Sequence, residues 1–195
     1  MKSPAEVAIM RQAGQLADAA MTRVIDMVQA GVRECDIAAA IYHQQISGTP
    51  EFGGDYPCCP PDLCIGERSI APHAAWTDDP LPESTVVNLE LNGCRHRYQV
   101  NLARTIVVGQ PLPAFLNLSE IAVEALNAGL EAVRPGRTCS EVDGDFRKAL
   151  ARHGIEKSLA SVIRPASGSL RPRANARRAF ARATKPCSSP AWCST

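Results

Sequence analysis

The stretch Thr85–Gly109 reads TVVNLELNGCRHRYQVNLARTIVVG. Its two ends, residues 86–91 and 98–108, are rich in β-branched and aromatic residues, whereas residues 92–97 between them are polar and contain a glycine. This pattern is typical of an antiparallel hairpin with its connection in the polar middle.

Two polar residues, Glu90 and Asn101, interrupt the apolar alternation, one on each arm of the hairpin. Side chains at matched places on paired strands can meet on one face of a sheet. A carboxylate there costs free energy unless it pairs with a group of opposite charge, binds a cation or takes part in chemistry. The two residues therefore form a candidate site.

The same stretch resembles the metal-binding hairpin of the pita-bread peptidase family M24, which contains methionine aminopeptidases, Xaa-Pro dipeptidases, creatinases and ectoine hydrolases. That hairpin usually reads I-D-x-G-x-x-x-x-G-Y-x-x-D-x-T-R-T, and both aspartates bind a two-metal centre. Glu90 takes the place of the first aspartate and Asn101 that of the second. Tyr98 and the pair Arg104-Thr105 match directly.

The resemblance implies a divalent metal cofactor, with Glu90 and Asn101 at two of the ligand positions. Both positions are substituted in this chain. Glutamate can bind a hard divalent cation, whereas neutral asparagine is a weaker ligand and cannot bridge two metals. The substitutions therefore argue against a standard two-metal centre.

Three local patterns are similar to the ectoine hydrolase branch of the family. They are E-x-x-G-C-x-x-R-Y, which begins at Glu90, the stretch Phe52–Pro57, and Ala71–His73. In the family, the histidine of the last pattern orients the scissile group or stabilises the charge that develops on it. The resemblance therefore implies that His73 is a catalytic residue.

Two helices are predicted before the hairpin. Ser3 and Glu6 form a capping box, and apolar residues then recur at helical spacing as far as Gly31. A second helix is predicted over residues 34–47. Residues 48–84 are rich in proline and glycine, which predicts loops with short strands.

Two more helices are predicted after the hairpin. Residues 113–133 are amphipathic, and a second capping box at Thr138 and Glu141 starts a helix that ends at Gly154. The predicted fold class is α+β. The order of helices and hairpin resembles the first half of a pita-bread fold, so residues 1–157 are interpreted as a partial catalytic domain.

Residues 158–195 have a different composition. Proline, alanine, arginine and serine dominate, and this segment contains none of the 20 acidic residues. Such a composition predicts a disordered basic tail. We hypothesise a frameshift in the gene. If GC-rich codons for residues 161–168 are read two bases along, they can encode GYSTGIG. The same shift over residues 182–195 can give GDETVLEPGMVFH. Both strings are expected in the second half of the family's catalytic domain.

Length and composition limit the number of domains, the compartment and the state of the cysteines. A chain of 195 residues with 45% apolar residues suits one globular domain. The sequence has no membrane-spanning run and no secretory leader, which favours the cytoplasm. Its eight cysteines are scattered and suggest free thiols. Zinc at Cys58, Cys59 and Cys64 is the alternative, but no histidine cluster lies nearby.

The resemblance implies hydrolysis of an amide-like C–N bond in a small dipeptide-like or ectoine-like substrate. The family's remaining ligands, a histidine and two glutamates, are missing, so the chain alone is expected to be inactive. Two alternatives stay open. A partner chain carrying the missing half could complete the site, or the basic tail could bind nucleic acid. The second is disfavoured because the tail lacks interleaved aromatic residues and the body is acidic. The resemblance also implies a possible homodimer.

Overall fold

The computed structural model describes residues 2–70, 73–156 and 186–187, and it confirms the α+β class. Its described residues form two compact units, which we call the sheet unit (Ser3–Pro111) and the helical unit (from Leu112 onward). The sheet unit contains α1 (Pro4–Ile25), α2 (Glu34–Ser47), β1 (Asp62–Ile65), the 3-10 helix η1 (Gly66–Ile70), β2 (Thr85–Arg95) and β3 (Tyr98–Val108). The helical unit contains α3 (Pro113–Ala132), β4 (Arg137–Thr138), α4 (Cys139–Ala151) and β5 (Pro186–Cys187).

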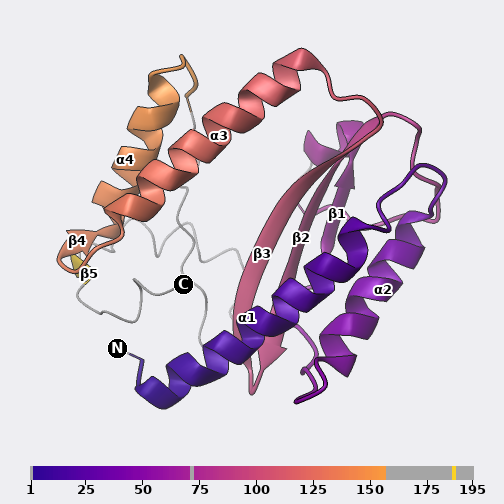
Figure 1. Cartoon of the computed structure of the whole chain (residues 1–195), viewed down its shortest axis with the longest axis horizontal. Coiled ribbons are helices and arrows are strands. Elements are labelled where there is room, and N and C mark those ends of the chain that lie inside the picture. Colours follow the sequence, from indigo (N-terminus) through magenta and orange to yellow (C-terminus); the bar gives the residue numbers. More distant parts are fainter. Residues whose placement is uncertain (1, 71–72, 157–185, 188–195) are drawn as a thin grey trace. The chain divides into compact units, whose positions relative to one another are not determined.

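The sheet unit is a three-stranded antiparallel sheet in the order β1-β2-β3, with α1 and α2 against one face (Figure 1). Every second residue of β1 and β2 points into the core between sheet and helices. Fully buried core side chains include Leu16, Ile37, Ile41, Leu63 and Leu89. Each such side chain stabilises the fold by about 1.5–3 kcal/mol relative to full exposure.

The start of α1 is fixed by the capping box predicted from Ser3 and Glu6. The Ser3 hydroxyl accepts from the Glu6 backbone N–H at 3.3 Å, and a Glu6 carboxylate oxygen accepts from the Ser3 N–H at 2.7 Å. The helix ends at Ile25, earlier than the glycine at position 31 suggested. Gly31 instead lies in the following turn with a φ of 82°, which glycine adopts without strain.

The hairpin is confirmed, but its connection is shorter than predicted. Only His96 and Arg97 join the two strands, and their φ values of 47° and 68° are those of a type I′ turn. The connection thus lies in the polar middle as predicted, but residues 92–95 belong to β2. Gly93 lies within β2, where an added Cβ would be 1.9 Å from the backbone oxygen of Ala13 in α1. The glycine permits close helix–strand packing rather than a turn.

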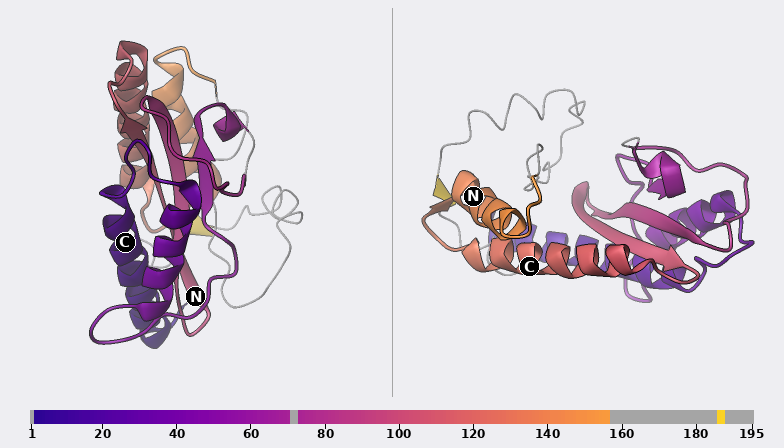
Figure 2. Two further views of the ribbon diagram at one scale, coloured as in Figure 1. Left: turned by 90° about the vertical axis from the view of Figure 1, so that its right-hand side faces the viewer. Right: turned by 90° about the horizontal axis from the view of Figure 1, so that it is seen from above.

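The helical unit packs α3 against α4, which lie side by side in Figure 2. Its core is formed by Ile121, Ala125, Ala149 and Leu150. The predicted capping box at the start of α4, between Thr138 and Glu141, is confirmed. Within the predicted basic tail, Pro186–Cys187 pair with Arg137–Thr138. The rest of residues 158–195, on which the tail and frameshift hypotheses depend, lies outside the described residues.

The two helix pairs share a local design. Gly31 and Gly136 both have a positive φ, 82° and 89°. Each stands two residues before the residue that caps the second helix of its pair, Arg33 for α2 and Thr138 for α4. A glycine with positive φ thus stands at the same distance before the second helix of each pair.

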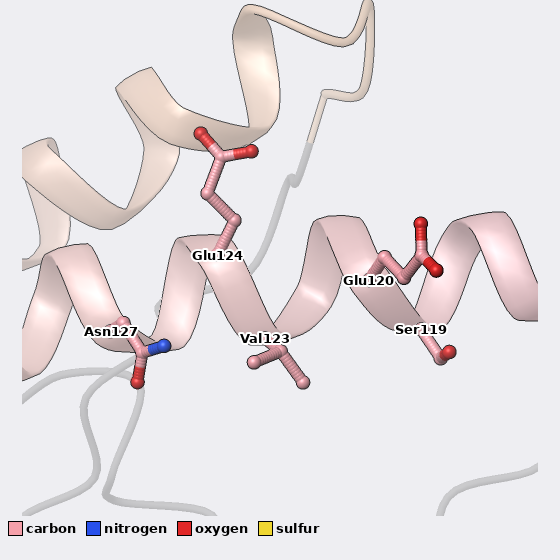
Figure 3. A pocket seen from close by; sticks show the side chains of 5 residues that line it. All are labelled: Ser119, Glu120, Val123, Glu124 and Asn127. Atoms are coloured by element: carbon pink, nitrogen blue, oxygen red, sulfur yellow. The ribbon is translucent and has the colours of Figure 1, made fainter.

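One face of α3 is apolar and exposed. This face, which we call the α3 stripe, includes Leu116, Val123, Leu126 and Leu130. Beside Val123, the side chains of Ser119, Glu120, Glu124 and Asn127 line a shallow depression on the same helix (Figure 3). Within residues 2–70, 73–156 and 186–187, no helix combines the length and apolar character that crossing a bilayer requires.

The α3 stripe gives a first prediction. Replacing Leu116 and Leu130 with glutamine should change stability by no more than about 0.5 kcal/mol, because both side chains are already exposed. Self-association measured by sedimentation velocity should fall, since exposed apolar patches promote association. Replacing the buried Ile121 with glutamine is the matched control and should lower the melting temperature instead. Unchanged self-association of the double variant would contradict the prediction.

Candidate functional site

One face of the sheet carries a group of polar side chains, which we call the polar face. In the register, Asp62 of β1 lies opposite Glu90 of β2, and Asn92 of β2 lies opposite Asn101 of β3. Residues directly opposite one another point to the same side of a sheet, as do alternate residues of one strand. Asp62, Glu90, Asn92 and Asn101 therefore share the face that is turned away from α1 and α2.

Glu90 and Asn101 lie diagonally and do not face each other directly. The direct partner of Glu90 on β3 is Ala103. Diagonal neighbours are about 7–8 Å apart, which long side chains can span. Glu90 is half-buried and Asn101 is exposed. The Glu90 carboxylate forms no ion pair with another described residue, so it can receive a ligand.

His73 is held at this face by Asp62. Its Nδ1 lies 2.5 Å from Asp62 Oδ2, and its backbone φ is 61°, which is uncommon for a residue other than glycine. The Asp62 side chain is only 12% exposed, whereas that of His73 is 49% exposed. Because a carboxylate accepts hydrogen bonds, Nδ1 carries the proton, and Nε2 of the neutral ring keeps its lone pair. Ala71 and Pro72, which precede His73 in the family pattern, lie outside the described residues.

The polar face concentrates negative charge. Asp62 and Glu90 are direct cross-strand partners, and like charges in that position destabilise a sheet. A cation near the pair relieves the repulsion. An imidazolium at His73, a metal ion or a cationic group of a substrate would each do so. The arrangement therefore favours a positively charged ligand beside Glu90.

Asp62 was not predicted from the sequence. The prediction assigned residues 48–84 to loops with short strands, so no residue there could be given a face of a sheet. One sequence feature could have revealed this strand. After two prolines, apolar Leu63 and Ile65 occupy every second position of residues 62–65, and both are buried in the core. In such a strand a polar residue at the first position must point away from the core.

Hydrogen bonds of uncharged side chains support the strands that carry the polar face. The Gln45 side-chain amide donates to the backbone oxygen of Asn92 at 2.6 Å. Asn92 Oδ1 is buried and, in the part of the chain that the structure describes, accepts no hydrogen bond. Thr105, part of the family pattern, donates through its hydroxyl to Asn88 Oδ1 at 3.0 Å. These contacts are amide and hydroxyl interactions, so they add no charge to the site.

Tyr98, which also matches the family pattern, lies away from these groups at the start of β3. Its hydroxyl donates to Glu6 Oε1 at 2.8 Å and thereby ties the hairpin to the beginning of α1. This hydrogen bond, together with partial burial, raises the pKa of Tyr98 above its usual value. The contact is structural.

The described side chains of the polar face do not supply the ligands of a two-metal centre. In the described ranges, no three His, Cys, Asp or Glu side chains are placed to hold a metal ion together. Of the two ligand positions expected from the family, Asn101 offers a neutral amide, which cannot bridge two cations. Asp62 is already engaged by His73. Glu90 is the remaining carboxylate.

The cysteines give a second prediction. The six cysteines between residues 2 and 156 are free thiols. Burial raises the pKa of the Cys94 thiol, and Asp55 raises it further, whereas Cys58 is exposed and donates to Gln99 Oε1 at 3.0 Å. Because the thiolate is the nucleophile, iodoacetamide at pH 8 should alkylate Cys58 well before Cys94, as mass spectrometry can measure. Unfolding in urea should remove the difference, and equal rates in the native protein would contradict it.

Comparison with known proteins places these residues in a family. An uncharacterized hydrolase/peptidase, y4tM of Sinorhizobium fredii, is 43% identical over 157 residues, which are 80% of this chain and 40% of that protein. The ectoine hydrolase of Halomonas elongata is 30% identical over 165 residues, 82% of this chain and 41% of the relative. The chain thus spans about two fifths of the length of these curated relatives.

The fold is also similar to that of solved structures. The prolidase of Pyrococcus furiosus superposes with a TM-score of 0.72 at 28% sequence identity, over 79% of this chain and 44% of the prolidase chain. The sequence pattern of metallopeptidase family M24 matches residues 8–171. That match includes the hairpin, His73, most of α1 and the whole of α2, α3 and α4. The chain belongs to metallopeptidase family M24.

Proposed function

We propose that the polar face is one half of the active site of a hydrolase that cleaves an amide-like C–N bond in a small dipeptide-like or ectoine-like substrate. The observation that carries this proposal is the contact between His73 and Asp62, beside Glu90 on the face that also carries Asn101. The relatives support the reaction class, since they include an ectoine hydrolase and Xaa-Pro dipeptidases.

In this proposal His73 exchanges a proton with the substrate. Asp62 accepts from Nδ1–H, which fixes the orientation of the ring and leaves Nε2 to act on the substrate. Protonated Nε2 can donate to the oxygen on which negative charge develops during attack on the carbonyl carbon. Glu90 attracts a cationic group of the substrate, and the Asn101 amide offers a donor and an acceptor to the polar atoms of the substrate.

Metal-dependent hydrolysis is general in the family, and a bound metal there supplies a hydroxide nucleophile. We propose that the described residues of this chain do not complete that arrangement, because Asn101 replaces a carboxylate and Asp62 is engaged by His73. The chain alone is then inactive. A partner chain that carries the missing half must then bring the groups that activate water.

A fusion protein tests the proposal. Residues 2–157 replace the matching segment of the Halomonas elongata ectoine hydrolase, and the fusion is assayed with ectoine and with an Xaa-Pro dipeptide. We expect hydrolysis by the fusion, none by the 195-residue chain alone, and a loss of activity when His73 is replaced by alanine in the fusion. A folded fusion that hydrolyses neither substrate would rule out both substrate classes. Equal rates with and without His73 would remove its catalytic role.

The same assay addresses the partner hypothesis. The chain is mixed with a separate polypeptide that carries the remaining segment of the ectoine hydrolase, and complex formation is followed by size-exclusion chromatography. Hydrolysis by the mixture would show that two chains can complete the site. Hydrolysis by the chain alone would show that the proposed inactivity is wrong.

A further inference from the structure

Glu34, at the first turn of α2, is a buried charge in the sheet unit. It is 3% exposed, although it belongs to a residue type that is rarely buried without a partner. One carboxylate oxygen, Oε1, accepts from Arg68 Nη2, and the other, Oε2, accepts from the backbone N–H of Thr77 at 2.7 Å. Both oxygens are thus satisfied, which is what burial of a carboxylate requires.

The two partners of Glu34 lie on either side of His73 in the chain. Arg68 belongs to η1, five residues before His73, and Thr77 follows four residues after it. Arg68 also donates through Nη1 to the backbone oxygen of Ala75 at 3.2 Å. Glu34 and Arg68 together therefore fasten both arms of the segment that carries His73 to α2.

A second contact with α2 lies in the same segment. The ring of Trp76 meets that of Tyr42 edge-on, with 5.9 Å between the centroids and 78° between the planes. His73 itself holds a φ of 61°, a conformation that persists only where the surroundings enforce it. The contacts of Glu34 and Tyr42 with this segment restrain its backbone, and both residues lie in α2, outside the polar face.

We propose that Glu34 is a positioning residue: it holds the His73 segment against α2 and so places the imidazole beside Asp62. This inference rests on the function proposed for His73 and extends it to a side chain that touches neither His73 nor the polar face. Replacing Glu34 with glutamine removes the ion pair with Arg68 but keeps an oxygen that can accept from Thr77. The variant therefore loosens the segment without leaving a buried charge at position 34.

Asp36, two residues further along α2, offers a matched control. It also lies in the first turn of the helix and also pairs with an arginine, Arg33, at 2.8 Å. This hydrogen bond lowers the pKa of Asp36, and both side chains are exposed. Replacing Asp36 with asparagine removes the same favourable charge from the N-terminus of α2. It leaves the His73 segment untouched.

The experiment compares the full chain with its Glu34→Gln and Asp36→Asn variants by two readouts. Nitrogen-15 spectra of the His73 ring report whether Nδ1 still donates to Asp62. Hydrogen exchange reports the local protection of residues 66–77 relative to the hairpin. In Glu34→Gln we expect the two ring nitrogens to shift toward those of a free imidazole. We also expect exchange in the segment to rise roughly tenfold or more, as the loss of one charge-assisted hydrogen bond implies.

Asp36→Asn should leave both readouts as in the unmodified chain. The proposal is overturned if Glu34→Gln keeps the native ring signals and segment protection, or if protection falls equally throughout residues 4–108, as a purely structural role requires. If Glu34→Gln does not fold, the double variant E34Q/R68Q, which leaves no buried charge, gives the same readouts. Neither readout depends on turnover, so failure of the proposed hydrolase activity would remain distinguishable.

Discussion

Replacing Gly93 with alanine is expected to cost about 3 kcal/mol or more of unfolding free energy, among the larger effects of a single substitution. An added Cβ would lie 1.9 Å from the Ala13 backbone oxygen and 2.6 Å from the Ala17 backbone nitrogen. Both atoms belong to the backbone of α1, which cannot rotate away as a side chain can. Either α1 separates from β2, which opens the core, or the chain does not fold.

The measurement is urea unfolding followed by circular dichroism, with Gly14→Ala as the control. Gly14 lies within α1, and an added Cβ there meets no atom within 4 Å. Alanine should stabilise the helix at that position by about 0.5–1 kcal/mol. Opposite signs for the two glycine substitutions are therefore expected. A Gly93→Ala variant as stable as the native chain would show that α1 does not cross β2 as closely as described.

Replacing Asp62 with asparagine is expected to lower kcat/KM of the active fusion by about 10²–10⁴-fold, the range that general acid–base catalysis contributes. An asparagine amide can donate to Nδ1 as well as accept from it, so it no longer fixes the proton on that nitrogen. The ring then populates the tautomer with the proton on Nε2. In that form the ring can donate from Nε2 but cannot take a proton back there, so the proton exchange proposed for His73 is interrupted.

Nitrogen-15 spectra of the His73 ring in the isolated chain provide a second measurement, which needs no activity. They should show Nδ1 protonated in the native chain and a mixture of tautomers in Asp62→Asn. Asp78→Asn is the control, because Asp78 is an exposed carboxylate in the turn that follows. It should change neither the spectra nor kcat/KM. Native ring signals in Asp62→Asn would contradict the assigned role.

Much of the fold could be predicted because local signals and packing agree. The capping boxes at Ser3 and Thr138 fixed the starts of α1 and α4, and apolar periodicity identified the helices between. The hairpin was predicted from its β-branched arms. Its connection is shorter than the polar middle, because residues 92–95 extend β2 and Gly93 packs against α1. Close approach of α1 is a tertiary contact, and a single sequence does not display it.

The site was predictable only in part. Glu90 and Asn101 could be paired because an interruption of alternation is visible in sequence, and the register places them on one face. The partner of His73 could not be predicted, because Asp62 lies 11 residues earlier in a stretch that was assigned to loops with short strands. Glu34 was equally hidden, since its partners Arg68 and Thr77 are 34 and 43 residues away along the chain.

The shared design of the two helix pairs has a practical consequence. In α1 a fully buried alanine, Ala20, is followed by Met21, which is 3% exposed, whereas in α3 the fully buried Ala125 is followed by Leu126, which is 53% exposed. At the corresponding position, α3 thus exposes a large apolar side chain to water, whereas α1 buries one. Because exposed apolar side chains promote aggregation, we expect this face of α3 to limit the concentration at which the chain stays in solution.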